Sequence, residues 1–108
     1  MKAWEKLQWY VADKFRDMGD IMARPTVGSG NGNENGDVYT KFPFTIECKQ
    51  RNTKDVTVSI DVWEKNKADI PLNSPKIPLV FLENKDVKRF VVLEADDFFN
   101  LLNVKEKE

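Results

Sequence analysis

The sequence contains no histidine, only one cysteine and no long run of apolar residues. Without histidine the chain cannot build a Ser-His-Asp or Cys-His catalytic set, and no imidazole can bind a metal. The single cysteine, Cys48, cannot form an intramolecular disulfide, which favours a reducing, intracellular setting. No segment approaches the roughly 20 apolar residues of a membrane-spanning helix, and the N-terminal MKAWEKLQWYVADKF lacks the apolar stretch of a signal peptide. We therefore expect a cytoplasmic protein with no membrane partner.

The chain also lacks an excess of charge of either sign. It has 17 Lys and Arg against 18 Asp and Glu, a formal net charge of −1. This balance argues against broad coating of nucleic acid, but it leaves room for a local basic groove. With 41% hydrophobic and 32% charged residues, the sequence predicts one folded domain over 1–108. The core of so small a domain is modest, so dimerisation would add stability.

Three helices are predicted. The first covers 2–18, where apolar residues recur at spacings of three and four, and Gly19 supplies its stop. The second covers about 59–69, with Ser59 as N-cap, although the apolar alternation at 56–62 also fits a strand. The third follows Asp96 as N-cap. The apolar stripe of the first helix is Trp4, Leu7, Val11, Phe15 and Met18, and that of the third is Phe98, Phe99, Leu101 and Leu102.

Strands are predicted between these helices, at 21–27, 37–42, 44–50, 76–83 and 89–94. The segment 28–37, rich in glycine and asparagine, is typical of a loop or wide turn, and it has no GKS or GKT of a phosphate loop. The order of helix, strands, helix, two strands and helix predicts a mixed α/β (α+β) fold, with a central mixed sheet flanked by helices.

Two carboxylates and an amine carry the candidate chemistry. The period of two places Glu47 and Lys49 on one face of strand 44–50, about 7 Å apart, and Asp37 on the neighbouring strand can point to the same side. Asp37 and Glu47 could then share a divalent metal, with the Cys48 carbonyl as a further ligand. Oxygen ligands favour Mg²⁺ or Mn²⁺. Such a metal activates water for phosphodiester hydrolysis, and the Lys49 ammonium stabilises the charge that develops.

The spacing Gly36-Asp37-x₉-Glu47-Cys48-Lys49 closely resembles the signature of PD-(D/E)XK nucleases. The wider pattern is similar to archaeal and phage Holliday-junction resolvases over nearly the whole chain. It consists of Arg24, Gly28-Ser29-Gly30, a helix around Trp63, the PLVF and RFVVLE strands and the DDFFNLL helix. The resemblance implies a restriction-endonuclease-like core. It also implies a magnesium-dependent endodeoxyribonuclease of DNA recombination and repair, encoded by a phage or its host, that cuts four-way junctions as a homodimer.

The resemblance also implies that Glu5, on the first helix, completes the metal site and that Ser29 contributes to activity. Gly36 stands where the family has proline, a residue that makes no metal contact. Gln50, Arg51 and Lys54 follow the motif directly and are expected to contact DNA phosphates. The wider basic strip would draw on some of Lys41, Arg24, Arg51, Lys54, Lys65 and Lys67.

Plainer interpretations stand beside these. A Glu-x-Lys triplet is common on solvated strands, where acids and bases pair across the sheet. Glu5 also fits a first-turn carboxylate that the helix dipole favours, and Cys48 fits a buried structural thiol. Trp4 and Trp63 are expected in the core, and Trp9 in a dimer contact.

Three functions remain open at this point. One is a junction resolvase, and the second is another PD-(D/E)XK nuclease that nicks or cuts like a restriction enzyme. The third is a non-catalytic DNA-binding module of the same fold.

Overall fold

A five-stranded mixed sheet carries the fold of the computed structural model, which describes residues 1–26 and 36–103. The strands lie side by side in chain order, and they are β1 (Arg24–Pro25), β2 (Val38–Tyr39), β3 (Phe44–Gln50), β4 (Ile77–Glu83) and β5 (Arg89–Val92). Neighbouring strands pair antiparallel except β3 and β4, which run parallel and are linked by helix α2 (Ile60–Ala68). The expected α+β domain with a mixed sheet flanked by helices is therefore confirmed.

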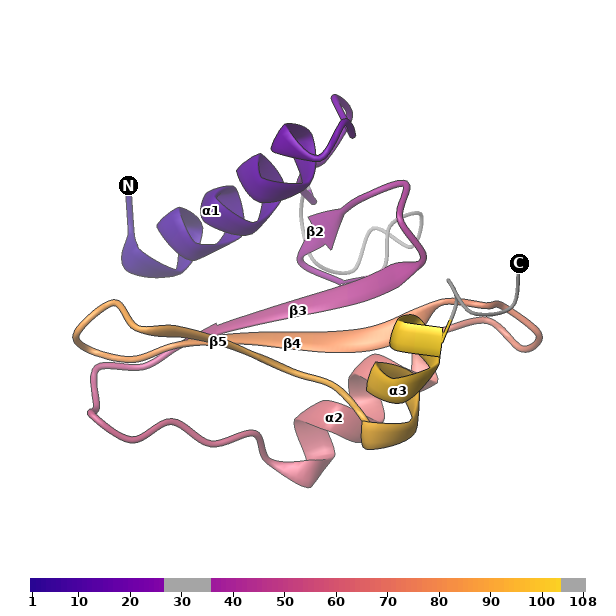
Figure 1. Cartoon of the computed structure of the whole chain (residues 1–108). Helices are drawn as coiled ribbons and strands as arrows, with labels where there is room; N and C mark the ends of the chain where they lie inside the picture. Colours follow the sequence, from indigo (N-terminus) through magenta and orange to yellow (C-terminus); the bar gives the residue numbers. More distant parts are fainter. Residues whose placement is uncertain (27–35, 104–108) are drawn as a thin grey trace.

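The two faces of this sheet are covered by different helices (Figure 1). Helix α1 (Ala3–Asp17) packs on one face and α2 on the other. The core on the α1 side includes Leu7, Val11 and Phe15 of the helix and Val38, Ile46 and Cys48 of the sheet. The core on the α2 side consists of Trp63, Val80 and Leu82. Side chains of β3 alternate between these faces, so Glu47 and Lys49 point away from α1.

All three predicted helices are present, and local signals set their ends. Gly19, with φ +104°, ends α1 in the left-handed conformation that glycine tolerates. The Ser59 side chain accepts a hydrogen bond from the Val62 N–H (3.2 Å), as an N-cap does. Helix α3 (Ala95–Asn103) begins earlier than predicted, so Asp96 lies in its first turn rather than at the cap.

The first two strands are shorter than predicted. Among the described residues, the strands cover 24–25 and 38–39, where 21–27 and 37–42 were predicted. The cause is the buried carboxylate of Asp20, which accepts hydrogen bonds from the Met22 N–H (3.1 Å), the Thr40 hydroxyl (2.7 Å) and the Lys41 N–H (2.7 Å). These bonds hold both segments in turns, where they cannot extend the strands.

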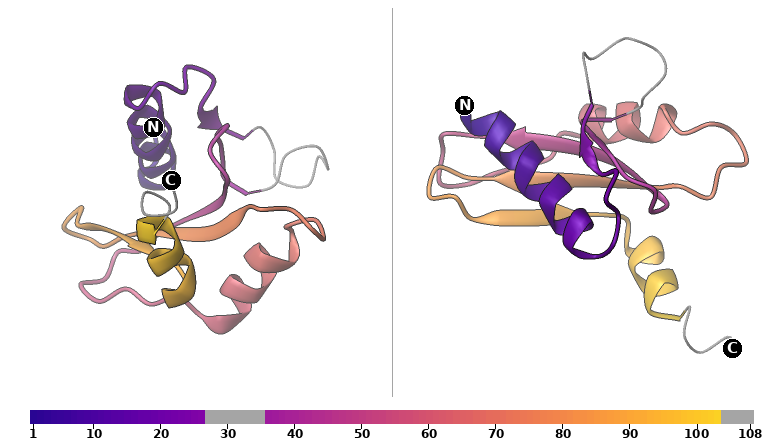
Figure 2. Two further views of the ribbon diagram at one scale, coloured as in Figure 1. Left: turned by 45° about the vertical axis from the view of Figure 1, so that its right-hand side comes forward. Right: turned by 90° about the horizontal axis from the view of Figure 1, so that it is seen from above.

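Two further outcomes concern the apolar residues. Trp63 is buried as predicted, but Trp4 is 49% exposed and does not belong to the core. None of the residues of α3 is buried, and in the right-hand view of Figure 2 this helix extends away from the sheet. In the described part of the chain, no helix has both the length and the apolar character to cross a membrane.

Candidate functional site

The pairing of β2 with β3 brings Asp37 and Glu47 together. Val38 lies opposite Ile46, so Asp37 comes opposite Glu47. The Asp37 N–H donates to the Ile46 carbonyl (2.6 Å), and the Asp37 Oδ2 accepts from the Cys48 N–H (2.8 Å). Because Val38, Ile46 and Cys48 all pack on the α1 side, the alternation of side chains turns both carboxylates to the α2 side.

The charge balance at Glu47 shows how close these groups are. Burial first, and then the neighbouring Asp37 carboxylate, raise the pKa of Glu47 to about 7. The ammonium groups of Lys49 and Lys65 oppose this shift. Two carboxylates that cannot both ionise freely are stabilised by a cation placed between them. The predicted cluster of Asp37, Glu47 and Lys49 is thus assembled on one face of the sheet.

Cys48 contributes its backbone rather than its thiol. The side chain is buried on the α1 side, and burial together with the nearby Asp37 and Glu47 raises the thiol pKa. A thiol held protonated in this way is a poor nucleophile, so the interpretation of Cys48 as a buried structural residue is confirmed. Its N–H faces Asp37, and the C=O of a strand residue points to the same side as its N–H. The Cys48 carbonyl therefore faces the edge where Asp37 lies.

Gly36 fixes the approach of Asp37 to β3. Its φ is +83°, and a Cβ at this position would lie 2.5 Å from the Ile46 carbonyl oxygen and 3.1 Å from the Ile46 nitrogen. Proline, whose ring holds φ near −65°, cannot adopt this conformation. Glycine rather than proline is therefore required at this position by the local backbone, a reason that the sequence alone did not reveal.

The structure does not bring Glu5 to this site. Its Oε1 accepts a hydrogen bond from the Lys2 N–H (3.0 Å) at the start of α1. Helix α1 packs on the face opposite to the two carboxylates, so Glu5 caps its own helix instead of approaching Glu47. Among residues 1–26 and 36–103, no three acidic or cysteine side chains gather where they could hold a metal. This corrects the expectation of a third carboxylate, and Ser29 lies outside the described residues.

The α2 helix supplies side chains to the site instead. Lys65 acts electrostatically on Glu47, whereas the sequence suggested only a place in a basic strip. Next to it, Asn66 is fully buried and its Nδ2 donates to the carbonyls of Thr45 (3.4 Å) and Leu79 (3.2 Å). Asn66 thereby fastens α2 to both parallel strands. Its Oδ1 is a buried acceptor with no hydrogen-bond partner in the described part of the chain.

No protein-family model, curated protein or solved structure matches this chain. The case for its function therefore depends on the geometry around Asp37, Glu47 and Lys49.

The residues expected to contact DNA are placed in several ways. The Arg24 guanidinium lies 5.5 Å from the centre of the Tyr39 ring, on the face that also carries Asp37. Lys67 is engaged elsewhere, because its amine pairs with the Glu94 carboxylate at 3.0 Å. The Gln50 side chain donates to the Arg51 carbonyl (3.2 Å) and so shapes the turn after β3. Arg51 and Lys54 are exposed just beyond that strand.

Proposed function

We propose that this chain is a magnesium-dependent endodeoxyribonuclease with a PD-(D/E)XK core, and that its substrate is branched DNA. The observation that carries the proposal is the meeting of the Asp37 and Glu47 carboxylates on one face of the sheet, beside Lys49. The chain path supports it. A helix, antiparallel strands and a parallel β3–α2–β4 crossover surround the motif in the order that the resemblance implies.

The donor set fits a hard cation. Asp37, Glu47 and the Cys48 carbonyl would hold Mg²⁺ or Mn²⁺ through oxygen atoms alone. When bound, the cation would lower the pKa of water and offset the charge of the phosphate. The Cys48 N–H fixes the orientation of Asp37, and Lys49 supplies a positive charge that stabilises negative charge on the phosphate oxygens. Lys65 adds a second positive charge beside Glu47.

Branched DNA is preferred over a specific sequence because residues 1–26 and 36–103 offer few elements that could read bases. In these ranges the elements around the site are strands, the turn after β3 and α2, and base-specific nucleases usually add loops or a separate recognition domain. A four-way junction needs two symmetric cuts, so the proposal includes a homodimer with one site in each subunit.

A cleavage assay with Mg²⁺ or Mn²⁺ tests this function. It compares a synthetic four-way junction with linear duplex, a flap and single-stranded DNA of equal length. Asp37→Asn and Glu47→Gln each remove a ligand charge, and we expect either to lower the cleavage rate by at least about 100-fold, the scale of a lost transition-state contact. The matched control is Asp13→Asn, which removes one exposed carboxylate from α1 on the other face.

Each outcome separates one of the three functions. Cleavage that survives in Asp37→Asn or Glu47→Gln would reject this site. Equal cleavage of junction and linear duplex would leave a general nuclease and exclude the resolvase. DNA binding by the wild-type protein without any metal-dependent cleavage would favour the non-catalytic module.

A further inference from the structure

Two loops are joined at the end of the sheet where β3 and β4 stop. Residues 51–55 follow β3, and residues 84–88 form the turn between β4 and β5. The Arg51 N–H donates to the Glu83 carbonyl (2.9 Å), and the Lys85 N–H donates to the Thr53 carbonyl (3.0 Å). The two loops therefore form a single structural unit, although they are 30 residues apart in the chain.

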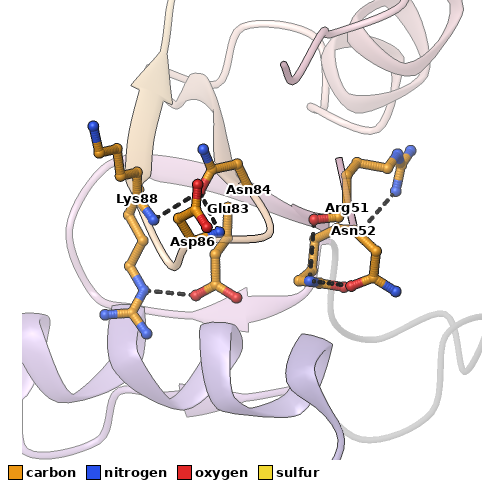
Figure 3. Close-up of polar contacts among 8 residues, drawn as sticks. Arg51, Asn52, Glu83, Asn84, Asp86 and Lys88 are labelled. Atoms are coloured by element: carbon orange, nitrogen blue, oxygen red, sulfur yellow. Dashed lines mark hydrogen bonds and ion pairs between the residues drawn. The ribbon is translucent and has the colours of Figure 1, made fainter. Parts of the chain in front are cut away.

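A buried asparagine fixes the shape of this unit. Asn84 is 5% exposed, and its Oδ1 accepts from the N–H groups of Asp86 (2.9 Å) and Lys88 (3.0 Å), as Figure 3 shows. Its Nδ2 donates to the Lys54 carbonyl (3.0 Å) in the other loop. Each of these three hydrogen bonds thus holds the backbone of a residue that is basic or adjacent to a basic one.

Positive charge gathers on these loops, although the formal net charge of the whole chain is −1. We call Arg51, Lys54, Lys85 and Lys88 the basic platform, and all four are exposed. The loops carry two acids, of which Asp86 lies 3.6 Å from the Lys85 amine. Within the described ranges, Lys54 and Lys88 form no ion pair. Their ammonium groups are therefore available to an external anion.

The platform continues the surface of the proposed site. Arg51 follows Lys49 by two residues, roughly 7 Å along the chain direction of β3. In Figure 3 the side chains of Arg51 and Lys88 point away from α1. Glu47 and Lys49 also point away from α1, because side chains alternate along β3. Arg89 turns the other way, where its Nε donates to Glu83 (2.7 Å) and its guanidinium lies 4.0 Å from the centre of the Tyr10 ring.

We propose that the basic platform binds the phosphate backbone of a DNA duplex, on the arm that leaves the site past Lys49. The identity of the polyanion as DNA rests on the proposed function. The loops contain no aromatic residue on which an unpaired base could stack, and binding of single strands normally uses such stacking. The platform instead presents four exposed basic side chains on a backbone that hydrogen bonds hold in place. Such side chains suit contacts to phosphates, which position a duplex without reading its sequence.

The test measures duplex binding by fluorescence anisotropy in EDTA, at several salt concentrations. The double variant Lys54→Ala/Lys88→Ala removes two platform charges, and Lys6→Ala/Lys76→Ala removes two exposed charges elsewhere. For the platform variant we expect the slope of log affinity against log salt to fall by about two, one for each lost phosphate contact. The control variant should keep the wild-type slope. Asn84→Ala removes no charge, but at temperatures where this variant is folded it should lower the slope as well. If Asn84 contributed to stability alone, the variant would have a lower Tm and an unchanged slope.

Several results would overturn the platform. The first is an equal change of the salt slope in the two double variants. The second is a platform variant that loses as much affinity for single-stranded DNA as for duplex DNA. The third is a wild-type protein that binds no duplex. Cleavage assays on the same proteins separate this inference from the proposed function. Wild-type protein that binds through the platform but does not cut would reject the nuclease and keep the platform. A platform variant that cuts with unchanged KM and kcat would reject the platform and keep the nuclease.

Discussion

The Glu47 carboxylate makes the stability of the protein depend on pH. Its pKa rises from 4.5 to about 7 on folding, first through burial and then through Asp37. Between these values the folded state holds a proton that the unfolded state has released, so the free energy of unfolding falls as pH rises from about 4.5 to about 7. Because Glu47 is only half-buried and solvent screens its charge, we expect a loss on the order of 1 kcal/mol.

Urea unfolding in EDTA between pH 5 and pH 8 measures this effect. Glu47→Gln cannot ionise, so its stability should stay level across the window and exceed that of the wild-type protein at pH 8. In a parallel series with Mg²⁺ in place of EDTA, the cation should stabilise the wild-type protein at pH 8, because a bound cation favours the folded state. It should stabilise the variant less. The same pH slope in both proteins would show that Glu47 is not the titrating group.

Gly36 offers a second prediction for a single residue. Gly36→Ala forces an L side chain into a left-handed conformation and against the Ile46 backbone, and we expect it to destabilise the fold by more than about 2 kcal/mol. The control is Gly19→Ala, at φ +104° with no atom within 4 Å of its Cβ, which adds only the backbone cost. Urea unfolding compares the two. If both variants lowered the free energy of unfolding by the same amount, the close approach of Gly36 to Ile46 would not contribute to the cost of Gly36→Ala.

Among the structural elements, the turn between β4 and β5 stores backbone strain. Val87 has φ +62°, a conformation that β-branched residues rarely adopt, whereas Asn73 at φ +68° is an ordinary residue for it. Val87→Asn should relieve this strain, and because the Val87 side chain is 56% exposed, little packing is lost. We expect stabilisation by about 1 kcal/mol, the lower part of the range for this strain. A lower Tm for Val87→Asn than for the wild-type protein would contradict this account.

At the scale of the whole molecule, α3 offers a surface for the proposed homodimer. Four large apolar side chains on this helix are between 38% and 59% exposed, and they are Phe98, Phe99, Leu101 and Leu102. The edge strand β5, which leads into α3, also exposes Phe90 and Val91, which point to opposite faces of the sheet. A second copy packed about a two-fold axis would bury the same set from each subunit. A phenylalanine buries about 150–250 Å² when fully covered, and Phe98 and Phe99, at 44% and 58% exposed, keep about half of that area for a partner.

Sedimentation velocity over a range of protein concentrations tests this dimer. The wild-type protein should associate in the micromolar range, and Phe99→Ser/Leu102→Ser should remain monomeric. The Tm of this variant should be close to that of the wild-type protein, because these side chains contribute little to the monomer core. Trp4→Ser, on α1, serves as the control for an exposed aromatic residue elsewhere. A wild-type protein that stays monomeric at concentrations 100-fold above the micromolar range would exclude a dimer through α3.

The sequence by itself determined the features that depend on local periodicity. The apolar spacing of three and four predicted α1, and the serine at position 59 predicted the start of α2, because helix formation and capping involve residues within one turn. Alternation along 44–50 placed Glu47 and Lys49 on one face, because the side-chain period of a strand is two. Asp37 joined them as predicted, because its strand is the antiparallel neighbour of β3.

Tertiary structure decided everything that depends on which face a distant element covers. Helix α1 packs on the side of Cys48, so Glu5 on it cannot reach Glu47, whereas α2 packs on the other side and brings Lys65 to the site. The Asp20 carboxylate shortened two strands through bonds to residues about 20 positions away. Asn84 joined loops 30 residues apart. Such contacts follow from the packing of whole elements, and no local pattern in the chain encodes them.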